Sequence, residues 1–545
     1  MASTLESTES TDLAGFGYRQ ELHRKLGTYA SFAAGFSFVS ILTTVFQLFF
    51  FGFSFGGPAF FWTWPIVFCG QLLVALCFAE LAGRYPISGA IYQWSRRLAN
   101  DVVGWFAGWV MIIAQTVTVA AAAIALQVVL PSIWSGFQLT GADPALTSKS
   151  GAANAVLLGT ILITLTTVVN AIGVRLMGLI NSAGVTMEIL GVIALSIALF
   201  AHAERGPGVV LHTEGVGGSF YLPAFLVSAL MAAYVMVGFD SAAELSEETR
   251  DPRRTAPRTI LKALVASGIG GAFLLMAALV AAPSVTDGTL ATGGLPYVLT
   301  ERLGPVGGRI MLVDVVVAIS VCTLAIQTAG SRMVFSMARD GVLPYSKALG
   351  TVSPRSGTPI LAAVVVGLGA VAVLVVNIGN ASLFLALSSV CIVMLYLAYL
   401  LVTGPLLYRR LKGWPGNLTR DQSAGHHTDD GGRLFALGAW GVPVNLLAVV
   451  WGAAMMTNLS WPRASVYDPA GEGWFLQYFA LIFVGVSIVA GVLCYAAYRE
   501  RERMRLEDLA EKAAAASIPP EPFRQGTQAP LVPAHGDPVF QLDPA

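Results

Sequence analysis

The sequence predicts an all-α protein that crosses a lipid bilayer many times. Of its 545 residues, 55% are hydrophobic and only 12% are charged, whereas soluble globular chains have about 25% charged residues. The chain also contains twelve separate apolar runs close to the roughly 20 residues that a spanning helix needs. The formal net charge is zero, so nothing indicates a nucleic acid as partner. The expected environment is the lipid bilayer.

The twelve apolar runs are taken as twelve predicted transmembrane helices. They cover roughly residues 30–54, 59–82, 101–130, 152–173, 177–202, 220–240, 259–283, 309–334, 359–379, 381–407, 434–456 and 474–498. The run that begins near residue 30 is too long for the apolar part of a signal peptide, so no cleavage is expected.

The polar segments divide the chain into a membrane core and its flanks. Residues 1–29 form a polar N-terminal tail, and residues 409–433 form a polar loop between ten spans at 30–408 and two further spans at 434–498. Residues 499–545 begin with a charged helical run and continue with a proline-rich stretch, which favours a solvated helix followed by disorder.

Loop charges predict the orientation. With both termini in the cytoplasm, all but five of the 32 lysines and arginines lie on the cytoplasmic side. The five exceptions are Lys149, Arg205, Arg302, Arg309 and Arg463. Such a bias is typical of membrane proteins with an even number of spans and internal termini. We therefore expect a multi-pass protein of the cell membrane with both ends cytoplasmic.

The most informative segment is YVMVGFDSAAELSEETRDPRRTAPRTI, residues 234–260, where an apolar span is interrupted near Gly238 and Asp240. An acidic residue inside a membrane is costly and is usually functional. Backbone that unwinds at membrane depth is tolerated only where it lines a cavity or is buried in protein. The pattern indicates a binding site within the bilayer, and hence a transporter.

An enzyme would need a nucleophile with a base, or a metal cluster, and the sequence shows neither. None of the six histidines falls in a recognisable motif with a serine or cysteine, and the five cysteines lie in apolar runs as packing residues would. His426 and His427 lie near Asp429 and Asp430 in the 409–433 loop, where solvated side chains are expected rather than a metal site. We expect no metal and no cofactor.

Four stretches resemble the amino acid–polyamine–organocation permease superfamily, most closely its branch of amino acid, GABA and choline permeases. They are GGPAFFWTWP (56–65), AELAGRYPISGAIYQWSRRL (79–98), VGFDSAAELSEETRDPRRTAPR (237–258), and SRMVFSMARDGVLP with SPRSGTP (331–344, 353–359). The resemblance covers about residues 25–500. It implies two inverted repeats of five spans plus two extra helices, with the first span of each repeat broken near the bilayer midplane.

Alignment from Gly56 and Gly57 places the first break at five successive residues, Ser40, Ile41, Leu42, Thr43 and Thr44. Many relatives have a glycine-rich triplet there, and this chain has no glycine. Because β-branched side chains resist positive φ, we expect a narrower break, or one in which the hydroxyls of Ser40, Thr43 and Thr44 bond the freed backbone.

The two breaks predict a site for a zwitterion. N–H groups at the start of the half-helix after the first break favour a carboxylate, and freed carbonyls around Val237 and Gly238 favour an ammonium. Tyr234 and Phe239 flank the second break, where either ring could stack on an ammonium or act as a gate. The resemblance implies an aromatic gate at Tyr234.

Two acidic residues are candidates for proton coupling. Glu188 lies in mid-span, where an isolated carboxylate is costly when ionised, and Asp240 lies where relatives place an acid after the second break. The alternative for Glu188 is a protonated structural hydrogen bonder. A sodium site would instead use hydroxyls such as Ser320 and Thr323 on the eighth span, with Thr328 also available. A proton is favoured, sodium stays open, and exchange needs neither.

Charged residues also indicate a cytoplasmic gate. The loop Glu244–Arg258 interleaves acids with arginines, which predicts ion pairs that break as the gate opens, or else a solvated loop at the membrane edge. Glu80 lies four residues before Arg84, the spacing of a helical ion pair.

The sequence favours a small neutral amino acid or a GABA-like zwitterion as substrate. No arginine lies in the expected cavity to pair with a second carboxylate. Choline or a polyamine is the alternative, since aromatic residues such as Phe46, Phe49 and Trp62 are abundant near the first break. An amino acid exchanger is the other alternative.

Overall fold

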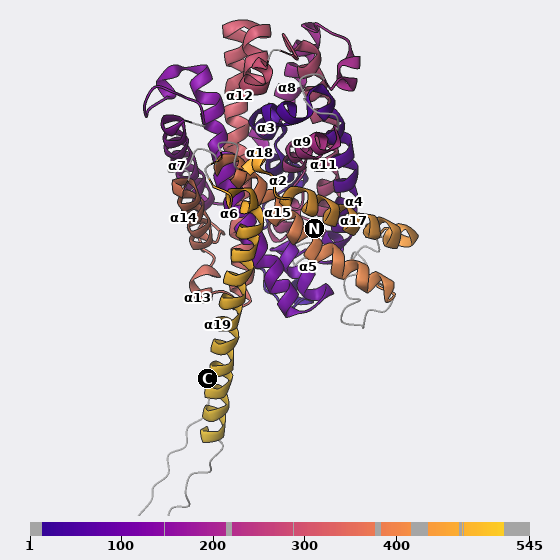
Figure 1. The fold of residues 1–545 in the computed structure, drawn as a ribbon. Coiled ribbons are helices and arrows are strands. Elements are labelled where there is room, and N and C mark those ends of the chain that lie inside the picture. Colours follow the sequence, from indigo (N-terminus) through magenta and orange to yellow (C-terminus); the bar gives the residue numbers. More distant parts are fainter. Residues whose placement is uncertain are drawn as a thin grey trace, which may run out of the picture. The chain divides into compact units, whose positions relative to one another are not determined.

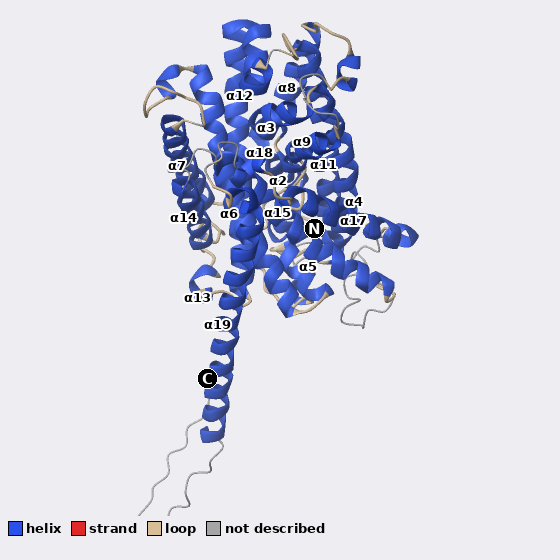
Figure 2. Ribbon diagram, viewed as in Figure 1, coloured by secondary structure: helices blue, strands red, loops and turns tan. Residues whose placement is uncertain are grey.

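The computed structural model describes residues 13–146, 148–213, 221–286, 288–376, 383–415, 434–467, 471 and 473–516. The regular elements in these ranges are all helices, and no strand occurs among them (Figure 2). The chain divides into a helical body, residues 1–495, and a C-terminal unit, residues 496–545, whose described part is helical. The prediction of an all-α membrane protein is confirmed at this level.

Ten helices of the described chain are long and apolar enough to cross a membrane. They are α2 (Thr28–Val39) with α3 (Ile41–Gly56), α4 (Thr63–Arg84), α6 (Asp101–Ile133), α7 (Lys149–Ile172), α8 (Val174–Ala201), α11 (Pro252–Ala281), α12 (Thr289–Arg339), α15 (Leu383–Leu411), α17 (Gly441–Ser460) and α19 (Phe479–Ala516). The other two predicted spans correspond to shorter apolar helices, α9 (Leu222–Val235) and α14 (Ile360–Val376).

Short helices connect these elements. They are α5 (Ala90–Leu98), α10 (Ser241–Glu244), α13 (Ser346–Leu349), α18 (Ala464–Tyr467), and the 3₁₀ turns η1 (Pro58–Trp62), η2 (Ser135–Phe137), η3 (Pro207–Leu211), η4 (Ser246–Glu248), η6 (Gly438–Trp440) and η7 (Leu476–Tyr478). Of these, α5, α10 and η4 matter most, because they bring charged residues to α12.

Helix α12 is much longer than the predicted span at 309–334. It has 51 residues, but Gly294 and Gly304 inside it have non-helical backbone angles, with φ of 56° and 68°. Proline follows each of them closely, at Pro296 and Pro305, and the residue before a proline is biased away from the helical region. The long element is therefore a series of helical pieces, of which the last contains the predicted span.

Burial separates central helices from peripheral ones. In the first span, Thr28–Gly56, 94% of the most apolar window is buried inside the protein, against 28% in Gly438–Ser460. The exposed residues Leu157, Ile161, Leu165 and Val168 of α7 recur at helical spacing, which is the pattern of a helix with one face toward lipid. The first span is therefore part of the core, whereas α7 and α17 lie at the edge.

The central helices pack against one another across the sequence. Helix α6 contacts α12 and α15, α3 contacts α9 and α12, and α4 contacts α11. At one side of the body, α7 and α14 lie next to each other (Figure 1). This packing places the two interruptions of the chain, after α2 and after α9, in the protein interior.

Candidate functional site

The first interruption is a single residue, Ser40, between α2 and α3. Its backbone angles, φ 35° and ψ 94°, are non-helical, and Ile41 already begins α3. The Thr44 hydroxyl donates to the Ser40 carbonyl at 2.6 Å, and the Ser40 and Thr43 hydroxyls lie 2.7 Å apart. The break is thus narrower than the five-residue window. Of the three hydroxyls expected to bond the freed backbone, only that of Thr44 does so, whereas those of Ser40 and Thr43 bond side chains.

Glu188 of α8 lies at the N-terminus of α3. Its Oε1 accepts hydrogen bonds from the Ser40 hydroxyl at 2.9 Å and from the Leu42 N–H at 3.1 Å. The side chain is buried, and the start of a helix favours negative charge. The carboxylate therefore uses part of the same helix terminus that the sequence predicts for a substrate carboxylate.

The second interruption separates α9 from α10, where the sequence predicts it. Residues 236–240 are non-helical, and Gly238 has φ of +85°. A Cβ atom at this position would lie 1.7 Å from Cδ1 of Phe38, so only glycine fits both the backbone angle and the close approach. Phe38 is the second residue before Ser40, and the two breaks are therefore in direct contact.

Tyr399 of α15 holds the second break. Its phenol oxygen accepts a hydrogen bond from the Gly238 N–H at 2.8 Å and donates to Oδ1 of Asp240 at 2.5 Å. Phe239 packs in the same region, with ring-centroid distances of 5.5 Å to Tyr399 and 6.0 Å to Phe78. Phe239 thus belongs to an aromatic core cluster.

A small cavity lies between the two breaks, with a volume of about 10 Å³, enough for about one water molecule. Its lining residues are Phe38, Thr44, Thr118, Ala122, Tyr234, Val237, Cys322, Ile326, Cys391 and Leu395. No charged side chain is among them. Of the predicted substrate residues, Thr44, Tyr234 and Val237 line this cavity, whereas Ile41 lines a separate apolar groove with residues of α8 and α11.

Tyr234 is fixed by a polar contact at one edge of the cavity. Its hydroxyl donates to Oε1 of Gln47 at 3.4 Å, and Nε2 of Gln47 donates to the Ala121 carbonyl at 2.8 Å. The ring therefore has a defined position against α3 and α6. Its role as a gate stays a prediction.

The hydroxyls considered for sodium bond their own helix. Ser320 donates to Val316 O, and Thr323 donates to Ile319 O, both at 2.8 Å. The side chain that reaches the end of α2 is instead Cys322, whose thiol lies 3.7 Å from the Phe38 carbonyl oxygen. This arrangement gives little support to the predicted sodium ligands, which stay a prediction.

The acids that follow the second break fall into two groups. Asp240 bonds Tyr399, and Glu244 Oε1 accepts from Nε2 of Gln115 at 3.1 Å. Glu247 and Glu248 instead form ion pairs with arginines of α12. Sequence reasoning missed Tyr399 and Gln115, because nothing in the local pattern links α6 and α15 to position 240.

Two buried ion pairs link the segment after the second break to α12. Arg339 makes two bonds to the Glu247 carboxylate, at 2.8 and 2.9 Å, and Nε of Arg332 lies 2.7 Å from Oε1 of Glu248. The Ser88 N–H also donates to Glu247 Oε1 at 3.0 Å. The sequence predicts ion pairs for this loop, but the partners of Glu247 and Glu248 come from α12 rather than from the loop itself.

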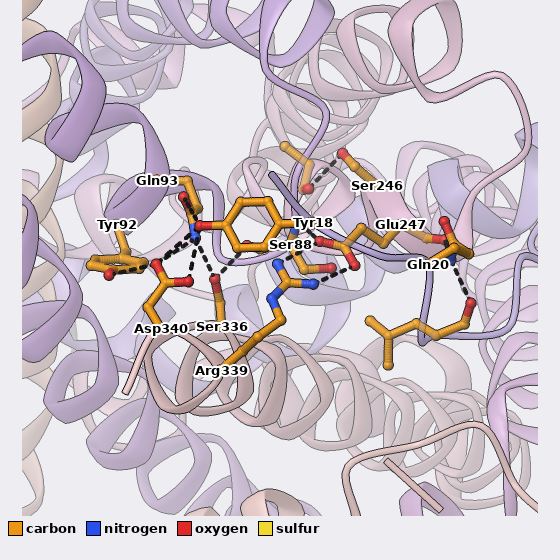
Figure 3. Close-up of polar contacts among 12 residues, drawn as sticks. Tyr18, Gln20, Ser88, Tyr92, Gln93, Ser246, Glu247, Ser336, Arg339 and Asp340 are labelled. Atoms are coloured by element: carbon orange, nitrogen blue, oxygen red, sulfur yellow. Dashed lines mark hydrogen bonds and ion pairs between the residues drawn. The ribbon is translucent and has the colours of Figure 1, made fainter. Parts of the chain in front are cut away.

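Residues 13–27 pack over these ion pairs. The Tyr18 hydroxyl donates to Asp340 at 2.9 Å, and the Arg339 guanidinium lies 4.1 Å from the centre of the Tyr18 ring. Figure 3 shows the guanidinium beside this ring and directed at the Glu247 carboxylate. Leu26 pairs with the backbone on both sides of Thr249. What the sequence presents as a polar tail is, from Leu13 on, an ordered part of the closure.

The predicted pair between Glu80 and Arg84 is confirmed, with a distance of 2.9 Å. Arg410 of α15 adds a second contact to the same carboxylate at 2.6 Å. The histidines and aspartates of the 409–433 loop lie outside the described residues.

Two broken helices that meet at a small cavity in the core of a membrane protein are the arrangement of a transporter. Comparison with known proteins agrees: residues 26–488 match the amino acid permease family, and the chain belongs to that family. It is 27% identical to the amino-acid permease BAT1 of Arabidopsis thaliana, over 83% of this chain and 88% of the relative. It is 29% identical to the BAT1 homolog of rice (Oryza sativa), over 83% and 87%.

A fungal relative covers more of the chain. Amino-acid permease 2 of Neurospora crassa is 26% identical over 90% of this chain and 88% of the relative. All three relatives carry the name amino-acid permease, and the family match includes both breaks and the central cavity. The resemblance seen in the four sequence stretches is therefore confirmed for the family.

Proposed function

We propose that this chain is a secondary active transporter that moves a small neutral amino acid or GABA-like zwitterion across the cell membrane together with protons. The observation that supports the substrate class is that the described residues lining the small cavity between the breaks, around which a larger site would open, are all uncharged. A charged substrate side chain would lose its hydration there without gaining an ionic partner. A zwitterion needs only two opposite partial charges, one for each end.

The helix ends beside the cavity supply those partial charges. The N-terminus of α3 carries positive partial charge, and the C-terminus of α9 carries negative partial charge. The two ends are close together, since Phe38 contacts Gly238. A substrate carboxylate would share the α3 terminus with Glu188, and an ammonium would face the carbonyls that follow Tyr234. Substrate contacts at Ser40, Leu42 and Thr43 are part of this proposal.

Proton coupling is supported by buried acids next to both breaks. Glu188 bonds the first break, and Asp240 bonds the tyrosine that holds the second. A proton gained or lost at either site changes the charge at a hinge. Sodium coupling through Ser320 and Thr323 has less support, because both hydroxyls bond carbonyls of α12 itself.

Helix packing supports alternating access by two inverted repeats with both termini cytoplasmic. The first span contacts the sixth through α3 and α9, the second contacts the seventh through α4 and α11, the third contacts the eighth through α6 and α12, and the fourth contacts the ninth through α7 and α14. Contacts between counterparts five spans apart are what a pseudo-twofold axis in the membrane plane produces.

An organic cation such as choline or a polyamine is the second candidate. Phe38 and Tyr234 are the aromatic residues of the cavity lining, and a quaternary ammonium would favour such rings. The lining contains no carboxylate for a polyamine. We therefore rank this candidate below a zwitterion.

Uptake of labelled GABA into proteoliposomes, competed by unlabelled amino acids, choline and putrescine, tests the proposal. We expect inhibition by neutral zwitterions and little by choline or putrescine. If choline or putrescine competes while amino acids are inert, the proposed binding of a substrate carboxylate at the α3 N-terminus is wrong. Asp143→Asn, in an exposed loop, serves as a control for protein quality.

A further inference from the structure

We propose that Asp240 and Glu244, positioned by Tyr399 and Gln115, form one proton-binding centre that holds a single exchangeable proton and releases it as the second break opens. This inference rests on the proposed proton-coupled transport and assigns the coupling step to a particular pair. Glu244 lies outside the substrate site derived above, and sequence reasoning placed it only in the mixed-charge loop.

The two carboxyl groups lie one helical turn apart and are completely buried. Asp240 precedes the first residue of α10, and Glu244 is its last, with the Glu244 N–H bonded to the Asp240 carbonyl at 3.2 Å. Both side chains have 0% exposure, as does Gln115. Residues four apart on a helix lie on the same face, so both acids share one water-poor environment between α6, α12 and α15.

The carboxylate oxygens of Asp240 and Glu244 have fewer hydrogen-bond donors around them than they can accept. Tyr399 supplies one donor to Asp240 Oδ1, and Gln115 supplies one to Glu244 Oε1. Asp240 Oδ2, Glu244 Oε2 and Gln115 Oε1 are buried and have no partner. Buried polar groups without partners are rare because each costs free energy. A proton on either carboxyl group provides the missing O–H donor.

No arginine or lysine of the described chain lies within 4.0 Å of either carboxylate. The charged and titratable groups on the elements around α10 include Arg332, Arg339, Asp340, Asp314 and Cys322 on α12, Arg253, Arg254, Arg258 and Lys262 on α11, Tyr92, Arg96 and Arg97 on α5, Glu80 and Arg84 on α4, Tyr396, Cys391, Arg409 and Arg410 on α15, Glu247 and Glu248 on η4, Tyr29 on α2 and Asp101 on α6. Arg332 and Arg339 bind Glu248 and Glu247.

Two ionised carboxylates this close in a buried site repel each other, and neither is compensated. Binding of one proton removes the repulsion and leaves a single negative charge shared by Tyr399 and Gln115. The ligand is therefore a proton. A monovalent metal cation would satisfy the same oxygens, and the experiment below separates the two.

The link to the hinge runs through Tyr399. Its phenol bonds both Asp240 and the Gly238 N–H, so the charge of the pair acts on the bond that fixes the second break. Loss of the proton restores repulsion between Asp240 and Glu244 and favours their separation, which requires α10 to move. Gain of the proton favours the closed arrangement seen here.

The test uses the purified full chain in proteoliposomes that contain a pH-sensitive dye. The wild-type protein should acidify the lumen when an amino acid substrate is added outside. In Glu244→Gln, substrate-driven proton entry should fall about tenfold or more, while exchange of internal for external substrate stays within about twofold of the wild type. Retained exchange shows that the variant is folded.

Two further variants sharpen the result. Glu244→Asp keeps a carboxyl group and should recover part of the proton entry, whereas Glu301→Gln, at an exposed outer position, should leave it unchanged. The proposal is overturned if Glu244→Gln carries protons as well as the wild type, or if accumulation needs a sodium gradient and ignores pH. Exchange of amino acids without any proton movement also overturns it and removes proton coupling from the proposed function, but leaves amino acid transport intact, whereas the absence of any amino acid transport refutes the proposed function as a whole.

Discussion

Two pairs of acids occur within nine residues of one another and are buried in different ways. Asp240 and Glu244 bond a tyrosine and a glutamine, and Glu247 and Glu248 bond two arginines. All four have 0% exposure. The difference in partners therefore cannot come from depth of burial. It comes from which helix faces each acid, since α6 and α15 provide neutral groups and α12 provides cations.

This difference separates two tasks. An acid that pairs with a buried arginine cannot lose its charge without leaving that arginine uncompensated, and removal of either partner leaves a buried charge alone. An acid with only neutral partners can change its charge without breaking an ion pair. We therefore interpret Glu247 and Glu248 as a latch between η4 and α12, and Asp240 and Glu244 as the proposed place where charge changes.

The largest effect on the free energy of unfolding is expected when an arginine that pairs with Glu247 or Glu248 is replaced. In Arg332→Met, Glu248 stays buried without its partner, which should lower the free energy of unfolding by about 3–5 kcal/mol. Equilibrium unfolding in mixed detergent and SDS micelles measures this. Arg503→Met removes an exposed pair with Glu500 and should cost less than about 1 kcal/mol. Equal losses in the two variants would contradict the latch.

A matched series of Glu→Gln variants compares the two pairs directly. Glu247→Gln gives up charge-assisted bonds to Arg339, and a loss of about 1.5–3 kcal/mol is expected. Glu244→Gln removes no ion pair, so the same unfolding experiment should show a change within about 0.5 kcal/mol or a gain. The comparison fails if Glu244→Gln is as destabilising as Glu247→Gln.

Tyr399→Phe tests the connection between the proton pair and the hinge. The change leaves the Gly238 N–H without its acceptor and should cost about 1–3 kcal/mol in the free energy of unfolding. Tyr408→Phe is the control on the same helix, because Tyr408 is exposed and its hydroxyl is open to solvent. Similar losses in both variants would show that Tyr399 has no special role at the break.

The smallest effect concerns residues 13–27, the N-terminal strap that packs over the two ion pairs. Tyr18→Phe keeps the ring on Arg339 but loses the bond to Asp340, which should weaken the closure by about 0.5–1.5 kcal/mol. Faster amide hydrogen exchange between residues 18 and 26 would report it. Unchanged exchange would show that the ring alone holds the strap.

This contact should not depend on pH in the physiological range. Burial, with Asp340 beside it, raises the pKa of the Tyr18 phenol above its ordinary value. The neutral donor therefore persists at neutral pH, and its contribution is lost only as the pH rises through that raised pKa. A pH-dependent closure near neutrality would have to arise elsewhere.

Much of the fold could be predicted because hydrophobic length is a local property. Ten of the predicted spans coincide with helical segments long enough to cross a membrane and the other two with shorter apolar helices, and the interruption near Gly238 is visible in the sequence as glycine and an acid within an apolar run. The exception is α12, which begins well before the predicted span and consists of helical pieces separated at Gly294 and Gly304. Apolar length does not reveal helical pieces that precede a span.

For each contact at the candidate site, the sequence could predict one residue but not its partner. Glu188 and Asp240 stand out because a carboxylate in an apolar run is costly. Their surroundings do not, because Leu42 is 146 residues from Glu188, and Tyr399 is 159 residues from Asp240. The same holds for Arg332 and Arg339, which look like ordinary basic residues at a helix end until folding brings Glu248 and Glu247 to them.

Ser40 has a consequence for the stability of the arrangement seen here. A serine at φ 35° is in a sparsely populated backbone region, which costs on the order of 1–3 kcal/mol. The closed arrangement bears that cost for as long as it persists, and any motion that returns Ser40 to an ordinary angle recovers it. Relative to glycine, which adopts such angles freely, a serine at this position makes the arrangement seen here less stable and favours any change that returns residue 40 to an ordinary backbone angle.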